Sequence, residues 1–72
     1  MYNQDGATAT IPHPLVHQQV REASTGRTGT LMDVLSQAIG FIDGEHRYAE
    51  VAYVRAPGGL EFTADPADLE PA

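Results

Sequence analysis

The chain has 72 residues and no cysteine, so it is long enough for one small domain and holds no disulfide. Ten acidic residues outnumber four arginines and give a formal net charge of −6, which raises the free-energy cost of approaching nucleic-acid phosphates or an anionic membrane surface. No apolar run approaches the length of a membrane span or of a signal peptide. We therefore expect a cytoplasmic protein that binds neither membranes nor, in the usual way, nucleic acid.

The first segment, residues 1–14, is polar and shows neither the helical nor the strand period of apolar residues. Pro12 and Pro14 favour extended backbone around them. We predict a flexible N-terminal arm, which can add to a sheet edge but does not nucleate a helix. A single small β domain over residues 15–72 follows it.

A weak alternation of apolar and polar residues predicts a strand over residues 16–23. We expect this strand to end at Ser24-Thr25-Gly26, because hydroxyl side chains bond to nearby backbone and glycine tolerates the positive φ that turns require. The chain then reverses and resumes at Thr28.

Residues 28–42 decide the fold, because their pattern fits either strands or a helix. In the strand interpretation, Thr30, Met32 and Val34 share one face of a first strand. The chain bends near Ser36-Gln37, and a second strand leads into an Asp-Gly pair at residues 43 and 44. Such a pair between apolar runs is a strong hairpin signal, since both residues accept the positive φ of a type I′ turn.

The helical interpretation places a helix over residues 30–41, with Thr30 as its cap and an apolar stripe along one side. The members of that stripe are Leu31, Leu35, Ala38, Ile39 and Ile42. The fold would then be α+β, with one helix across a three-stranded sheet of residues 16–23, 47–55 and 60–64. Gly40 and several β-branched residues disfavour a helix, so we predict strands here.

Residues 47–55 give the clearest strand, because β-branched and aromatic residues are frequent in them. Both faces are largely apolar, which suits a central strand covered on both sides. One face carries Tyr48, Ala52 and Val54, and the other carries Ala49, Val51 and Tyr53. Pro57-Gly58-Gly59 then turns the chain, with Gly58 free to take a positive φ.

A short final strand over residues 60–64 has one polar face, and Phe62 on its apolar face is a predicted core residue. Asp65 is a suitable helix cap and Pro66 suits the first helical position. We therefore predict a C-terminal helical turn, with Leu69 folded back on the end of the domain.

This order of elements resembles a small SH3-like barrel of about five short antiparallel strands with a C-terminal helical turn. In particular, residues 26–32, residues 52–62 and the Asp65-Pro66 turn resemble those of short, functionally uncharacterised actinobacterial proteins. Those proteins have a tryptophan where this chain has Phe62. The resemblance implies a mainly β fold and no particular activity, since SH3-like barrels host peptide binding, RNA binding and structural roles alike.

Residue types used in catalysis are present, but not in the patterns that the chemistry needs. His13 and His17 are four residues apart, yet Pro14 between them argues against a helix that would align them as metal ligands. No Gly-x-Ser-x-Gly elbow occurs, and so short a chain leaves little room for a substrate pocket. We predict no enzyme, no cofactor and no metal site.

Tyr48, Tyr53, Arg55 and Phe62 are the predicted partner-binding residues, because tyrosine and arginine are over-represented among interface hot spots. Packing in the core is the competing explanation for at least two of the three aromatic side chains.

The leading functional hypothesis is a non-catalytic protein-interaction or accessory module with an unknown protein partner, because open strand edges can be extended by a partner. One alternative is a nucleic-acid-process protein, which either mimics a nucleic acid or contacts RNA through a local arginine cluster. The arginines concerned are Arg21, Arg27, Arg47 and Arg55. The other alternative is a self-associating structural unit, most simply a two-fold homodimer.

Overall fold

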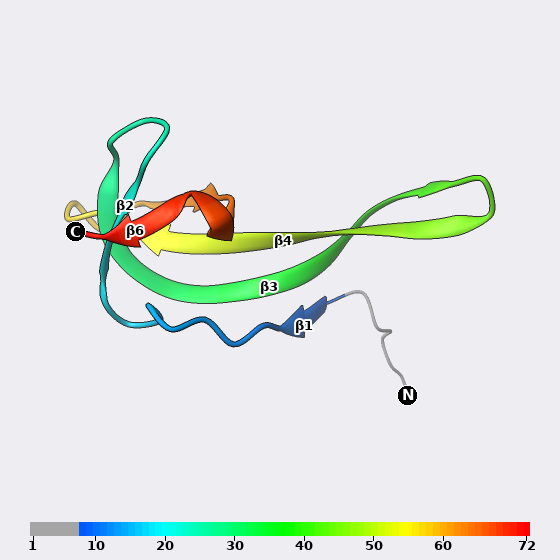
Figure 1. The fold of residues 1–72 in the computed structure, drawn as a ribbon, viewed down its shortest axis with the longest axis horizontal. Coiled ribbons are helices and arrows are strands. Elements are labelled where there is room, and N and C mark those ends of the chain that lie inside the picture. Colours follow the sequence, from blue (N-terminus) through cyan, green and yellow to red (C-terminus); the bar gives the residue numbers. More distant parts are fainter. Residues whose placement is uncertain (1–7) are drawn as a thin grey trace.

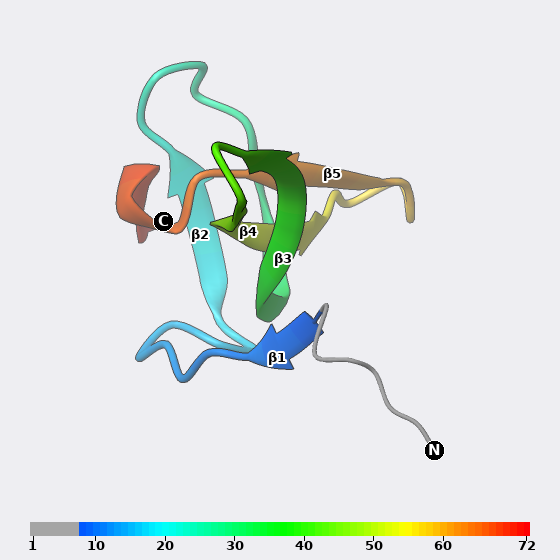
Figure 2. The same cartoon turned by 90° about the vertical axis from the view of Figure 1, so that its right-hand side faces the viewer.

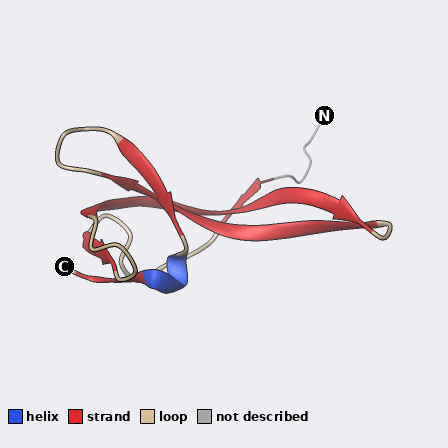
Figure 3. Cartoon of the chain, turned by 90° about the horizontal axis from the view of Figure 1, so that it is seen from above, coloured by secondary structure: helices blue, strands red, loops and turns tan. Residues whose placement is uncertain are grey.

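The computed structural model describes residues 8–72, which form one antiparallel sheet of six strands and a single helical turn (Figures 1 and 3). The elements are β1 (Thr8–Thr10), β2 (Gln19–Glu22), β3 (Thr28–Ile42), β4 (Glu45–Arg55), β5 (Glu61–Ala64), the 3-10 helix η1 (Pro66–Asp68) and β6 (Leu69–Pro71). In space the order is β5-β4-β3-β2-β6, and β1 pairs with β3. The prediction of a mainly β fold is confirmed. The sheet is not closed into a barrel.

Strand β3 settles the choice left open by the sequence, because it is extended over its whole length. Strand β4 pairs with it from Thr30 opposite Arg55 to Ile42 opposite Glu45. The two strands are joined by Asp43-Gly44, whose φ angles of 54° and 80° are those of the expected tight hairpin turn. The strand prediction for residues 30–42 is confirmed, and the alternative of a helix over residues 30–41 is wrong.

Strand β3 contains two irregularities that were not predicted, and the first of them changes which of its side chains are buried. The register shifts between Leu31 and Asp33, so Met32 is an extra residue without an opposite partner. Leu31 and Val34 are therefore both fully buried, in place of the predicted face of Thr30, Met32 and Val34. The predicted bend at Ser36-Gln37 is not found, because pairing with β4 continues there, and the second irregularity follows Ala38.

The boundaries of two other predicted elements also differ. Strand β2 is shorter than the predicted 16–23, because residues 14–18 form a turn in which His17 has a φ of 69°. In the turn after β4, Gly59 and not Gly58 takes the positive φ, at 93°.

The core lies between β2, β3, β4 and β5, where the sheet folds over itself (Figure 2). Its buried members are Val20, Leu31, Val34, Ala52, Val54 and Ala64. Ile11, Leu15, Val16, Phe62 and Leu69 are partly buried against them. Gly29 of β3 lies against β4, because a Cβ atom there would lie 2.8 Å from Val54 Cγ1 and collide with the Arg55 carbonyl.

The predicted C-terminal helical turn is present, and a short strand that was not predicted follows it. The Asp65 carboxylate accepts a hydrogen bond of 2.9 Å from the Ala67 N–H, and Pro66 occupies the start of η1. Strand β6 then pairs with β2, with Leu69 opposite Glu22, and Leu69 packs against the core.

The N-terminal segment lies along the same edge of β3 as β2. Thr8 is opposite Gln37 and Thr10 is opposite Leu35, and the Ile11 N–H donates a bond of 2.8 Å to the Val34 carbonyl. Residues 8–11 of the predicted arm are thus added to a sheet edge, which extended backbone around Pro12 permits. Residues 1–7 of that arm lie outside the described residues, and its flexibility stays a prediction.

Candidate functional site

The hairpin of β3 and β4 extends well beyond the core and divides the molecule into two regions (Figure 1). We call residues 38–48 the hairpin tip and the remaining described residues the body. Only five large apolar side chains of the described residues are exposed, and four lie in the tip. They are Ile39 (64% exposed), Phe41 (63%), Ile42 (53%) and Tyr48 (53%). Because exposed apolar side chains gathered on one projection are unusual, the tip is the candidate site.

An aromatic row follows one face of the tip. Phe41 lies opposite His46, with ring centroids 4.9 Å apart in an edge-to-face arrangement. The Tyr48 ring lies next along β4, at 6.3 Å from the His46 ring. The register shift after Ala38 places Phe41 on this face, because one extra residue in β3 reverses the alternation of its side chains.

The outer edge of β4 is the second feature of this region. Strand β5 ends opposite Ala52, so no strand within residues 8–72 pairs with this edge from Glu45 to Val51. The Ala56 N–H donates a bond of 2.8 Å to the Leu60 carbonyl, so the main chain of Ala56 faces the side of β4 on which β5 lies. Main-chain groups alternate between the two edges of a strand, and β4 has no bulge. The N–H and C=O groups of His46, Tyr48 and Glu50 therefore point away from β3.

The four predicted partner-binding residues are not brought together. Tyr48 lies in the tip, whereas Tyr53 and Arg55 share the opposite face of β4 in the body. The Tyr53 hydroxyl accepts a bond of 2.6 Å from the Gln37 amide, and Arg55 pairs with Glu61 at 3.8 Å. Phe62 lies on the core side, opposite Val54. Of the four, Tyr48 alone belongs to the exposed surface of the tip.

Sequence reasoning missed Phe41 and His46 as site residues. Phe41 falls within the predicted strand that leads into Asp43-Gly44, and His46 follows that turn, so neither pattern marked a binding residue. The lengths of the predicted strands did indicate that part of the hairpin would be left uncovered. The apolar pattern continues to Ile42, whereas the last predicted strand, residues 60–64, is too short to cover a hairpin of that reach.

Phe62 has a structural role in a cluster around Glu22. The Glu22 side chain is almost buried and accepts bonds from the Thr25 hydroxyl (2.5 Å) and Arg27 Nε (2.8 Å). The Arg27 guanidinium lies 4.0 Å from the centroid of the Phe62 ring. The Thr25 hydroxyl and then Arg27 lower the pKa of Glu22 below its ordinary value, because both bind the ionised carboxylate.

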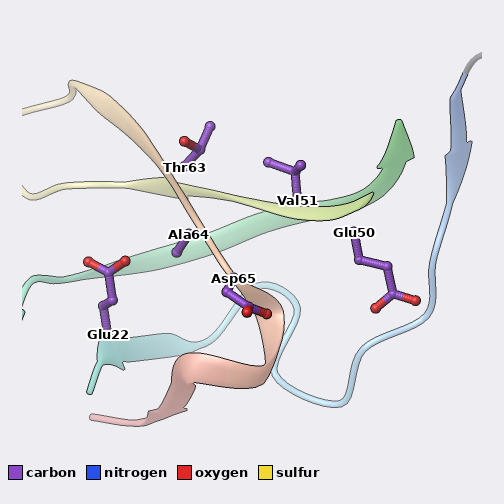
Figure 4. A pocket seen from close by; sticks show the side chains of 6 residues that line it. All are labelled: Glu22, Glu50, Val51, Thr63, Ala64 and Asp65. Carbon is purple, nitrogen blue, oxygen red and sulfur yellow. The ribbon is translucent and has the colours of Figure 1, made fainter. Parts of the chain in front are cut away.

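Two open depressions mark the body. One, of about 380 Å³, lies beside the free edge of β4 and is lined by Glu22, Glu50, Val51, Thr63, Ala64 and Asp65 (Figure 4). The other, of about 310 Å³, is lined by Met32, Asp33, Leu35, Tyr53 and Glu61. Three acidic residues line the first depression, and one of them, Glu22, is already bound by Arg27, so Glu50 and Asp65 are the carboxylates that a hydrogen-bond donor could approach there.

The arginines of the nucleic-acid hypothesis are spread over the molecule. Arg21 pairs with Glu70 at 2.6 Å, Arg27 with Glu22 at 2.8 Å, and Arg55 with Glu61. Arg47 lies in the tip, opposite Gly40. Three of the four guanidinium groups thus face a carboxylate of this chain.

Among residues 8–72 there is no set of three or more histidine and acidic side chains arranged to hold a metal ion. The described part of the chain also contains no helix long and apolar enough to cross a membrane. Comparison of the chain with models of protein families, with curated proteins and with solved structures finds no match.

Proposed function

We propose that this chain is a non-catalytic protein-interaction module whose hairpin tip receives an extended segment of a partner protein. The observation that carries the proposal is the coincidence, on one projection, of four exposed apolar side chains and a strand edge with which no strand of residues 8–72 pairs. Main-chain bonds to such an edge supply affinity, and neighbouring side chains supply selectivity.

The aromatic row supports this mode of binding. A strand added beside β4 brings its alternate side chains next to His46 and Tyr48, with Phe41 one strand further along the same face. An aromatic or aliphatic side chain in the partner fits beside Tyr48, because it buries the exposed ring, whereas a hydrogen-bond acceptor fits beside the imidazole of His46.

The SH3-like resemblance belongs to the same proposal. Two of its elements support it, namely the turn at residues 57–59 between β4 and β5 and the helical turn η1 that follows β5. We regard the body as an open variant of that arrangement, which carries the tip. The resemblance to actinobacterial proteins and the cytoplasmic location stay predictions.

A capture experiment with matched variants tests the proposed function. Phe41→Ser removes an apolar side chain from the tip, and Leu60→Ser removes the one large exposed apolar side chain of the described body, which is 80% exposed. Partners captured from host extract at physiological salt by the wild type are identified, purified and titrated against both variants. We expect binding to be retained by Leu60→Ser and lost or strongly weakened by Phe41→Ser.

Two outcomes contradict the proposal. One is the absence of any captured protein by a method that recovers known weak binders. The other is a partner whose affinity falls equally in both variants, which would place its binding site outside the tip. The nucleic-acid alternative stays a prediction without a supporting observation, since three of the four arginines are paired.

A further inference from the structure

The free edge of β4 is symmetric about Tyr48. It comprises the seven residues 45–51, and its outward-facing main-chain groups belong to His46, Tyr48 and Glu50. A two-fold axis normal to the sheet at Tyr48 places a second copy of this edge antiparallel to the first. Tyr48 then faces its own copy, and His46 faces the copy's Glu50. Each facing pair exchanges two N–H···O bonds, so the three pairs satisfy all the outward-facing N–H and C=O groups of His46, Tyr48 and Glu50.

Neighbouring registers are poorer. A shift centred on Arg47 sets two guanidinium groups opposite each other and shortens the overlap, and like charges directly opposite destabilise a sheet. A shift centred on Ala49 requires Ala52, whose edge is already occupied by Ala64 of β5. Registers displaced by one residue oppose side chains that point to different faces. The edge therefore specifies the register centred on Tyr48.

Side-chain chemistry agrees with this register. Glu50 lines the acidic depression beside the free edge, together with Glu22 and Asp65 (Figure 4). Glu22 is bound by Arg27 and Asp65 accepts from the Ala67 N–H, whereas Glu50 has no ion pair among the described residues. The copy's His46 faces Glu50 and so brings an imidazole N–H donor to this carboxylate. On the same face the two Tyr48 rings meet and cover each other next to Phe41, which buries part of the exposed aromatic row.

We propose that the partner of the hairpin tip is a second copy of this chain, bound as a two-fold dimer through antiparallel pairing of residues 45–51. The inference rests on the proposed function in one respect, namely that the tip is a protein-binding surface. The two bodies lie at opposite ends of the dimer, because each β4 leads away from the shared axis. The β3 and β4 strands of both copies then form one continuous four-stranded sheet.

Cross-linking tests the register directly, because the chain has no native cysteine. In hydrogen-bonded antiparallel pairs the facing Cα atoms are about 5.5 Å apart, which lies within the range that a disulfide spans. Under mild oxidation we expect Tyr48→Cys to form a covalent dimer. The matched control is Ala49→Cys, whose side chain points to the other face and lies opposite Arg47 of the copy, so it should stay uncross-linked. Equal cross-linking of the two variants overturns the proposed register.

Sedimentation of the full chain tests the dimer without cysteine. We expect a concentration-dependent monomer–dimer equilibrium in the wild type. His46→Glu should weaken dimerisation by about 2- to 30-fold, because it creates two like-charge pairs with Glu50 of the copy. The double variant His46→Glu/Glu50→Lys should restore it. Circular dichroism of each variant separates weakened association from unfolding.

The results distinguish this inference from the proposed function. A wild type that remains monomeric up to millimolar concentration overturns the dimer, as does a dimer that the double variant fails to restore. If a different protein then binds the monomer and is lost with Phe41→Ser, the proposed function stands alone. A dimer that captures no other protein supports self-association as the role of the tip.

Discussion

The body and the hairpin tip are built from the same two strands, yet the same kinds of residue are used differently in them. In the body, β3 and β4 lie between β2 and β5, and apolar residues such as Leu31 and Val54 are fully buried. In the tip no other strand of residues 8–72 pairs with these two, and Phe41 and Tyr48 remain exposed. The difference shows that a strand-forming sequence does not decide whether a side chain is buried. The neighbouring elements decide it.

Truncation of a large side chain should change the free energy of unfolding far more in the body than in the tip. Leu31→Ala in the body should lower the free energy of unfolding by about 2–5 kcal/mol, because it leaves a cavity in a small core. Phe41→Ala in the tip should change it by about 0.5 kcal/mol or less, since a ring that is 63% exposed loses little packing. Urea unfolding of the monomer measures both. A comparable loss in the two variants would mean that the tip is packed against the body.

Gly29→Ala in the body and Gly40→Ala in the tip should change stability with opposite signs. Gly29→Ala places a methyl group against the Arg55 carbonyl and should destabilise the body by about 1–3 kcal/mol. At Gly40 in the tip no atom lies within 4 Å of the added Cβ and φ is not positive. Gly40→Ala should therefore stabilise the chain by up to about 1 kcal/mol, through the unfolded state. Thermal or urea unfolding distinguishes the signs, and a stabilised Gly29→Ala would contradict the close strand approach.

The Asp43-Gly44 turn allows a test of whether the tip opens independently of the body. Gly44 has a φ of 80°, so Gly44→Ala should weaken pairing in the tip by about 1 kcal/mol. Hydrogen exchange of the inward-facing tip amides should speed up about 5-fold, while exchange in the body stays unchanged. Gly58→Ala, where φ is not positive and nothing lies close, is the control. Equal acceleration in the body would show that tip and body open together.

The pH dependence of stability should come from the Glu22 cluster in the body, with the smallest effect. The Thr25 hydroxyl and Arg27 lower the pKa of Glu22 in the folded chain. The carboxylate therefore stabilises the fold above its unfolded pKa, and this contribution is lost as pH falls through the lower folded value. Glu22→Gln and Thr25→Val should each flatten the acid side of the stability curve measured by thermal unfolding. An unchanged curve in both variants would contradict this role.

Local chemistry predicted much of the fold. Asp43-Gly44 and Asp65-Pro66 specify a hairpin turn and a helical start through their own conformational preferences, so they were recognisable without knowledge of any neighbour. The extra residue at Met32 was not recognisable, because a bulge exists only in relation to the strand opposite. Its omission put the predicted buried face of β3 out of phase with the observed one.

The candidate site was less accessible to prediction than the fold. Tyr48 and Tyr53 have similar surroundings in the sequence, but β5 ends opposite Ala52, between the two regions they belong to. That boundary depends on where Pro57, Gly58 and Gly59 reverse the chain, and on the length of pairing that follows. Phe62 was correctly placed on the core side, and its contact with Arg27 required the turn around Gly26, where φ is 79°.

The pairing of β2 with β6 has a consequence for the order of events during synthesis. Arg21 cannot pair with Glu70 until the ribosome has added the 49 residues that separate them in sequence. The tip requires only the two strands that flank Asp43-Gly44, and such hairpins form in about 1–10 μs. A nascent chain should thus display the apolar hairpin before the body is complete. This early exposure would make the tip a target for chaperones, or for another chain emerging from the same polysome.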